Sequence, residues 1–303
     1  MKTAKSRPGD RVSPRQQHNW DWRAASNFIA GGAGGGLLFC AAFASLWGGD
    51  VRALLLGGMA LIGVGLTCVW FEIGRPWRAL NVFRHIATSW MTREAAVAPL
   101  VFVCGGLALF AGYSIFVLLT GVFGAAFVYA QARILSADKG IPAWRHPRCL
   151  PMLVATGFAE GAALVALALP FVKTSASAQI GVAAVVLLLL LIRVLLWRNY
   201  LAGLRADGAP EGSLRALTLV DGQFLMFGNL LPAVLLLIAA IAAPQADIAL
   251  IPAGLLVVGG GWLLKYTLVR RAAFTQGFAL PHLPVRGRGT AGAAVKPGWG
   301  GVN

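Results

Sequence analysis

Hydrophobic residues along the chain are gathered into eight long runs, which short polar stretches separate. The runs cover approximately residues 26–47, 53–71, 95–112, 114–134, 150–171, 178–197, 223–243 and 248–269. A helix needs about 20 apolar residues to cross the hydrocarbon of a bilayer. The pattern therefore predicts an all-α, polytopic integral membrane protein with eight transmembrane helices. The narrowest boundary is AGYS, residues 111–114, between the third and fourth runs.

Composition and charge add an orientation to this prediction. With 58% hydrophobic and 12% charged residues, the chain lies outside the range of ordinary soluble proteins. The net charge is +15, and every Lys and Arg except Arg52 and Lys173 falls in the tails or in the 2–3, 4–5 and 6–7 connections and their helix ends. Since such residues collect on the cytoplasmic side, we expect both termini in the cytoplasm. Membrane topology explains the basic residues, so no nucleic-acid partner is expected.

The chain divides into three parts. Residues 1–24 are expected to form a basic N-terminal arm that is retained, 25–271 the eight-helix membrane domain, and 272–303 a tail rich in Gly, Pro and Arg. The first span contains GGAGGG, residues 31–36, which lacks the spacing and the Gly-Lys-Ser/Thr of a phosphate loop. Its GxxxG spacing predicts close approach of two helices, with contact to a ligand as the alternative.

One polar stretch stands out, FEIGRPWRALNVFRHIATSWMTREA, residues 71–95. Apolar and basic residues alternate loosely in it, as in a segment that lies in the membrane interface. Glu72 and Glu94 stand at the two helix ends that flank it. Charge topology accounts for the arginines but does not require an acid at a helix end. The stretch is therefore a candidate site, in which carboxyl, arginine and histidine groups supply hydrogen bonds and a route for protons.

The motifs GRPWRALN and TSWMTREA in this stretch, with ARILSADKGIPAWRHP at residues 132–147, resemble the DMSO reductase anchor subunit family, the DmsC and NrfD-like proteins. The resemblance implies a bacterial inner-membrane subunit that anchors an iron–sulfur ferredoxin-like subunit and a molybdopterin catalytic subunit. It also implies electron exchange with menaquinone or ubiquinone in respiratory or anaerobic electron transport. The protein itself would then carry no catalysis of the substrate reaction.

The resemblance and the polar pattern together give a set of site residues. The expected quinone-binding residues are Glu72, Gly74, Arg75, Pro76, Arg78, Asn81, His85, Glu94 and Glu160. The expected partner-docking residues are Arg84, Arg93, Arg133, Trp144 and Arg145. By the family likeness Gly74, Pro76, Arg78 and Asn81 fall on motif positions around the quinone pocket. Glu72 stands where several relatives carry a histidine, so in this protein a carboxyl group would carry the proton at that position.

Glu160 lies near the middle of the fifth span, where a charge is costly and must face a polar interior. It belongs either to quinone binding or proton transfer, or to a buried hydrogen bond between helices. Arg193 lies near a helix end and is expected to snorkel, with the pocket as the alternative. Asp221, Gln223 and Asn229 are lesser candidates of the same kind.

Neither metal nor haem is expected in this protein. Its four cysteines are far apart, without a CxxC pair, so zinc and iron–sulfur clusters have no ligand set. The four histidines all lie in tails or connections, whereas haem-bearing anchors need paired histidines inside their helices.

Two other functions compete with the quinone-reactive anchor. A secondary transporter would show inverted repeats and helices broken at mid-membrane, and neither is evident. A purely structural anchor that binds no quinone differs from the leading hypothesis only through Glu72 and Glu160. Within the leading hypothesis, the charge topology places the partner subunits in the cytosol. FTQGFALPHLPVRG, residues 274–287, is similar to the anchors of phenylacetyl-CoA:acceptor oxidoreductases, which implies a cytosolic CoA thioester as substrate.

Overall fold

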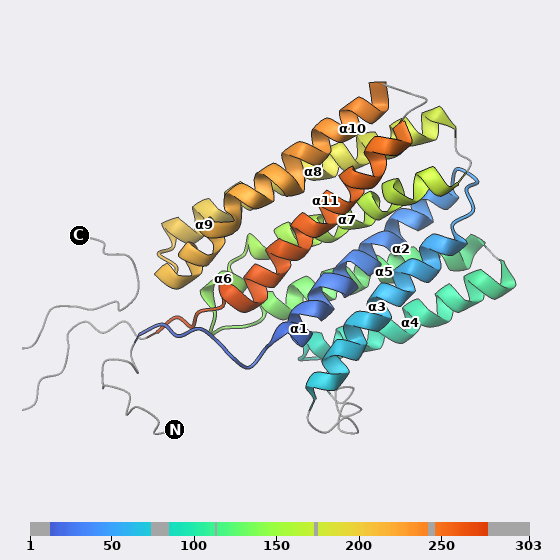
Figure 1. Ribbon diagram of the computed structural model, residues 1–303. Coiled ribbons are helices and arrows are strands. Elements are labelled where there is room, and N and C mark those ends of the chain that lie inside the picture. The colour runs from blue at the N-terminus through green and yellow to red at the C-terminus, as the bar shows by residue number, and fades with distance from the viewer. Residues whose placement is uncertain (1–12, 74–84, 113, 173–174, 242–245, 278–303) are drawn as a thin grey trace, which may run out of the picture.

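The computed structural model describes residues 13–73, 85–112, 114–172, 175–241 and 246–277 (Figure 1). Within these residues it contains eight helices long and apolar enough to span a membrane, which confirms the predicted all-α architecture. The first comprises α1 (Trp22–Ser26), the π-helical turn η2 (Asn27–Gly31) and α2 (Gly32–Ser45); the next three are α3 (Arg52–Glu72), α4 (Trp90–Ala111) and α5 (Ser114–Ser136). The short α6 (Pro142–Arg145) precedes α7 (Cys149–Ala168), which continues as the 3₁₀ turn η4 (Leu169–Phe171). Then follow α8 (Ala176–Ala206), α9 (Glu211–Leu225) with η5 (Met226–Leu230) and α10 (Leu231–Ile241), and α11 (Ala246–Tyr266) with η6 (Thr267–Arg271).

The third and fourth spans meet where the AGYS motif predicts a turn. Helix α4 begins behind the N-cap Ser89, whose hydroxyl accepts a hydrogen bond from the Thr92 backbone N–H. It ends at Gly112, whose φ of 71° is a left-handed conformation that glycine adopts without strain.

Two helices are longer than their apolar runs. Helix α8 continues to Ala206 and α9 already begins at Glu211, so the sixth and seventh spans project together beyond the predicted boundaries. The extension is amphipathic: Trp197, Tyr200 and Leu204 are buried, while Arg198 and Arg205 face outward. A search for wholly apolar windows misses such helix ends because they pack against protein and not against lipid.

Helix α2 is the central helix of the fold, and its glycines explain why. It packs against α3, α5 and α7. A Cβ on Gly36 would collide with the Gly157 carbonyl oxygen of α7, and one on Gly35 would lie 2.6 Å from the Gly124 oxygen of α5. The GGAGGG motif therefore serves the close helix packing that its spacing predicts.

The bundle has two groups of helices (Figure 1). Helices α2 to α5 surround one apolar core, and α7, α8, α10 and α11 surround another. A third apolar cluster lies at one end of the bundle, where residues of the helices α5 through α9 pack against the two terminal segments. The outward faces carry large apolar side chains, such as Phe110 at 94% exposure, as expected of a lipid-facing surface.

The two terminal segments meet at the same end of the bundle, at the lower left of Figure 1. The backbone N–H of Gln17 donates to the Ala273 oxygen, and the N–H of Thr275 donates to the Arg15 oxygen. The 4–5 connection and the turn at residues 207–210 lie there too, beside α6 and the start of α9. We call this the basic end.

Candidate functional site

Glu72 and Glu94, which flank the polar stretch in the sequence, line one small cavity at the basic end. Glu72 is the last residue of α3, and Glu94 lies in the second turn of α4. The cavity measures about 50 Å³, room for a few water molecules. Its lining consists of Trp20, Ala24, Asn27, Phe28, Val69, Glu72, Met91, Glu94 and Ile134.

Glu94 is held deep in this wall. It is 6% exposed, and its Oε1 accepts a hydrogen bond of 3.0 Å from the Asn27 Nδ2 of η2. The Gln131 side chain of α5 also interacts with this carboxyl group, and Gln131 Nε2 donates to the Asn27 backbone oxygen at 2.9 Å. This last bond satisfies an oxygen inside the π-helical turn, where the regular α-helical pattern is broken. Asn27 and Gln131 thus orient Glu94 toward the cavity.

Glu72 is more exposed to solvent than Glu94. It is partly buried, and Asp21 and Arg23 at the start of α1 interact with it electrostatically. Arg23 donates to the Phe71 backbone oxygen at 2.7 Å and pairs with Asp21 at 2.8 Å. The Arg23 guanidinium holds the pKa of the Asp21 carboxyl below its ordinary value, chiefly through their hydrogen bond. The salt-bridged entry of α1 therefore fixes one side of the cavity at the membrane boundary.

The arrangement suits proton transfer at the edge of the membrane. One carboxyl is buried and oriented, the other stands partly open, and a water-sized space connects their surroundings. Carboxyl groups accept hydrogen bonds when ionised and donate one when protonated. Such a pair can serve a polar ring bearing oxygen atoms and can pass protons to water.

The other expected quinone-binding residues divide into two groups. Gly74, Arg75, Pro76, Arg78 and Asn81 lie outside the described residues, as does the docking candidate Arg84. His85 is exposed, and its backbone oxygen accepts from Ser89 at 2.9 Å. Glu160 and His85 are both absent from the lining of the Glu72 and Glu94 cavity.

Glu160 instead belongs to a second group of buried polar side chains in the other half of the bundle. Lys265 Nζ of α11 donates to Glu160 Oε2 at 2.5 Å, with both side chains no more than 3% exposed. Arg193 of α8 donates to Asn229 Oδ1 at 2.8 Å, to the Val257 oxygen at 3.2 Å and to the Gly228 oxygen. The expected snorkelling of Arg193 is therefore wrong, because the π-helical turn η5 offers it acceptors inside the protein.

The two remaining candidates near Arg193 lie elsewhere. Asp221 accepts from Trp197 Nε1 at 2.6 Å and pairs with Arg198 at 3.1 Å, so it ties α8 to α9. Gln223 is exposed on the outer face of α9.

The expected docking residues also differ in position. Arg93 and Arg133 lie over the Trp90 ring, with centroid distances of 4.2 and 4.7 Å, beside the 2–3 connection. Trp144 is 3% exposed; it stacks on Trp20 and donates to the Leu268 oxygen, which gives it an interior position. Arg145 is exposed at the basic end.

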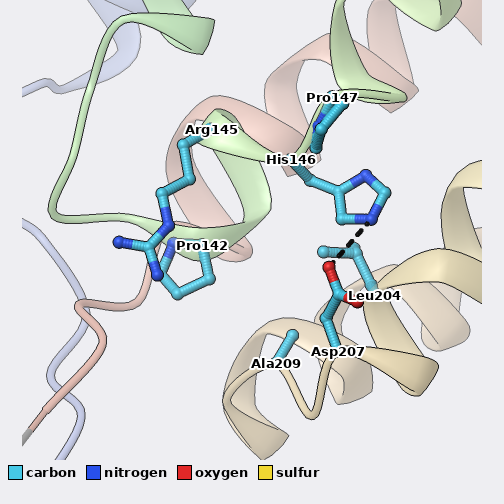
Figure 2. Close-up of a pocket in the computed structure, with 7 residues that line it drawn as sticks. All are labelled: Pro142, Arg145, His146, Pro147, Leu204, Asp207 and Ala209. Carbon is cyan, nitrogen blue, oxygen red and sulfur yellow. Dashed lines mark ion pairs between the residues drawn. The ribbon is translucent and has the colours of Figure 1, made fainter.

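Arg145 lies at the mouth of a larger cavity, of about 180 Å³, between the α6 region and the turn that links α8 to α9 (Figure 2). His146 faces Asp207 across it, with Nε2 3.3 Å from Oδ2. Burial lowers the pKa of His146, while Asp207 acts in the opposite sense. A Cβ on Gly203 would lie 2.6 Å from the His146 ring, so glycine admits the imidazole here.

Reasoning from the sequence missed Asn27, Gln131 and Lys265. Lys265 stands near the end of the last span, where a basic residue also fits the charge rule. The sequence did offer one signal for Lys265: it stands alone within the last apolar run, five residues before the Arg270–Arg271 pair. Asn27 and Gln131 are single polar residues in apolar helices, and the sequence does not say which neighbour they face.

Comparison with known proteins agrees with this architecture. The DMSO reductase anchor subunit (DmsC) family matches residues 49–200, half of the sequence, which includes the polar stretch and both carboxyls of the cavity. The protein belongs to this family of membrane anchor subunits. It is similar to the C subunit of the anaerobic dimethyl sulfoxide reductase of Escherichia coli (strain K12), with 26% identity over 144 residues. That match spans 42% of this protein and about half, 49%, of the relative.

Proposed function

We propose that this anchor subunit exchanges electrons between membrane quinone and an iron–sulfur ferredoxin-like subunit, at the cavity formed by Glu72 and Glu94. The observation that carries the proposal is that two carboxyl groups from different helices share one cavity at the end of the membrane span. Family membership makes the protein an anchor, and the cavity supplies the chemistry that a quinone site requires. Either menaquinone or ubiquinone fits this donor set.

Quinone, when bound, supplies two-electron redox chemistry that is coupled to two protons. Glu94 would hydrogen-bond one ring oxygen, because the hydrogen bond from Asn27, at 3.0 Å, fixes the orientation of its carboxyl group in the cavity wall. Glu72 would pass protons between the cavity and the aqueous phase, since it is only partly buried. The cavity of about 50 Å³ would have to widen to admit a quinone ring, and Met91, Val69 and Ile134 would then offer apolar contact surface to the ring and its hydrocarbon chain.

The partner subunits would dock on the basic end. Arg93 and Arg145 present positive charge beside the cavity and beside the 4–5 connection. A molybdopterin catalytic subunit would follow the iron–sulfur subunit outward. The charge distribution favours a cytoplasmic location for this end, in a bacterial inner membrane. Since the residues after 277 lie outside the described part, the likeness of 274–287 to phenylacetyl-CoA:acceptor oxidoreductase anchors alone supports a CoA thioester as the substrate of that subunit.

Paired rate measurements on the assembled complex test the quinone site. Glu94→Gln is expected to lower quinone-linked turnover about a hundredfold, because loss of a general acid or base has effects of this order. Glu72→Gln should lower it less, since Glu72 is only partly buried and water can take over its proton transfer. Turnover with a soluble dye, which bypasses the anchor, should stay unchanged. Glu211→Gln, which alters an exposed carboxylate of the 6–7 region, is the matched control.

Normal quinone-linked turnover in both variants would remove the cavity from the mechanism. Such a result, with a complex that still assembles, would favour a purely structural anchor. Loss of dye-linked turnover as well would indicate failed assembly, and the ratio of the two activities in the fraction that assembles would then decide between the two functions.

A further inference from the structure

The buried polar group in the C-terminal half is a site of its own. Glu160 comes from α7, Arg193 from α8, Asn229 from η5 and Lys265 from α11, so four segments contribute to it. Each of these side chains is at most 3% exposed. Burying ionisable groups at this depth is costly, and a helix-packing role would be met by neutral side chains.

The charge of this site depends on one proton. Arg193 is always protonated, and three hydrogen bonds to Asn229, Val257 and Gly228 satisfy it without help from Glu160. With Lys265 as ammonium and Glu160 as carboxylate the site carries a net charge of +1. Removal of one proton from the Glu160–Lys265 pair makes it neutral. Burial opposes the extra charge and the 2.5 Å contact favours it, so the two states compete.

The Glu160 carboxyl group has an open position for that proton. In the described part of the sequence Glu160 Oε1 is buried and has no hydrogen-bond partner. Gly261 lies against it, since a Cβ there would collide with Oε1. The charged groups that interact with Glu160 are Lys265 and Arg193, and those that interact with Lys265 are Glu160 and Arg193.

Polar groups lie between this site and the cavity at Glu94. Glu94 accepts from Asn27, and the Asn27 backbone oxygen accepts from Gln131 Nε2. Gln131 Oε1 and Lys265 Nζ lie 3.5 and 2.5 Å from the point where a Cβ of Gly32 would stand. Both polar groups therefore border the space that a side chain at position 32 would fill.

We propose that Glu160 and Lys265, held beside the fixed charge of Arg193, form a proton-binding site in the membrane interior. The site takes up one proton per protein molecule and needs no metal or organic ligand. The binding of this proton does not depend on quinone, so the site stands independently of the proposed quinone reaction.

Nuclear magnetic resonance of the full-length protein in detergent, with ¹³C at the ε-carbon of lysine and with neither quinone nor partner present, tests the proposal. The Lys265 signal is identified by its loss in Lys265→Arg, which keeps a cation but cannot release its proton. We expect this signal to titrate separately from those of the other lysines. Glu160→Gln should shift its midpoint by about one to three pH units, the usual effect of a charge partner at contact distance. Lys139→Arg, at an exposed position, is the matched control and should leave the Lys265 titration unchanged.

A Lys265 signal that stays in one protonation state throughout the pH range in which the wild-type protein remains folded would overturn the proposal and make the pair a fixed structural ion pair. The wild-type titration alone decides this point, so a variant that fails to fold does not affect the test. Because quinone is absent, neither result bears on the activity of Glu72 and Glu94.

Discussion

At the scale of single residues, the protein pairs the buried side chains of Glu94, Arg193 and Glu160 with partners from other helices. Asn27 donates a hydrogen bond to Glu94, Arg193 donates one to Asn229, and Lys265 donates one to Glu160. An unpaired charge at such a position would cost several kcal/mol, on the order that burial in hydrocarbon imposes. These partners come from different helices, so the polar groups also fix how the helices are arranged.

His146 gives a prediction about pH at this scale. Burial lowers the pKa of His146 from its ordinary value of 6.5. The unfolded protein therefore binds a proton at this histidine more readily than the folded one, and stability is lost as the pH falls from 6.5 through the lower pKa of the folded state. Melting temperatures of the purified protein should fall over this range, and His146→Gln should remove part of the fall. An identical pH dependence in the variant would contradict this role.

The residues that the sequence predicts best are those where polarity is unexpected. Glu72 and Glu94 stand out because the positive-inside rule explains basic residues at a helix end but not acidic ones. The structure places both carboxyl groups on one cavity. Glu160 stands out for its depth, but the sequence does not exclude it from the same pocket. Only the packing of α7 against α11 shows that its partner is Lys265. Pairing between distant helices is a property of the packed bundle and leaves no periodic signal.

At the scale of elements, the hydrophobic pattern specifies neither the π-helical turns nor the close helix contacts at the glycines of α2. The turns η2 and η5 each contain the asparagine of a buried polar group, and η6 begins two residues after Lys265. A π-helical turn breaks the regular backbone hydrogen bonds, so its carbonyl groups can accept from side chains, as Gly228 does from Arg193. The eight runs predict the helices, whereas these local breaks depend on tertiary contacts.

Gly36→Ala tests the role of α2 as the central helix. The added methyl group would meet the Gly157 backbone oxygen, which cannot rotate away, so we expect a loss of about 1–3 kcal/mol in the free energy of unfolding. Gly106→Ala is the matched control, because nothing lies within 4 Å of its Cβ position on α4. Denaturant titration in detergent measures both. Equal stability of the two variants would show that the α2–α7 contact is less close than described.

At the scale of the whole molecule, the basic end brings together the cavity, both terminal segments and the exposed arginines. A subunit that docks there would lie beside the proposed quinone site, which would shorten the path for electrons. Purification of the tagged protein from its native membrane should therefore yield an iron–sulfur subunit and a molybdenum-containing subunit in equal amounts, as mass spectrometry and metal analysis measure. If the protein is extracted intact but alone and without metal, that result would contradict the proposed partners.

Orientation is a separate property of the whole molecule. Lys139→Cys places a thiol in the 4–5 connection, and Asp50→Cys places one at the opposite end; both positions are exposed. A membrane-impermeant maleimide should label Asp50→Cys in spheroplasts and label Lys139→Cys only after the membrane is opened, with the unsubstituted protein as background. The reverse pattern would place the basic end outside, and would show that its charges complement a partner and do not follow topology.

Photolabelling of the assembled complex with an azidoquinone tests the central claim most directly. The proposal predicts adducts on peptides that contain Val69, Met91 or Ile134, which line the cavity with Glu72 and Glu94. These adducts should decrease when unmodified quinone competes and when Glu94 is replaced by Gln. Adducts confined to the outward faces of the helices, or adducts that neither competition nor Glu94→Gln diminishes, would show that this cavity is not where quinone binds.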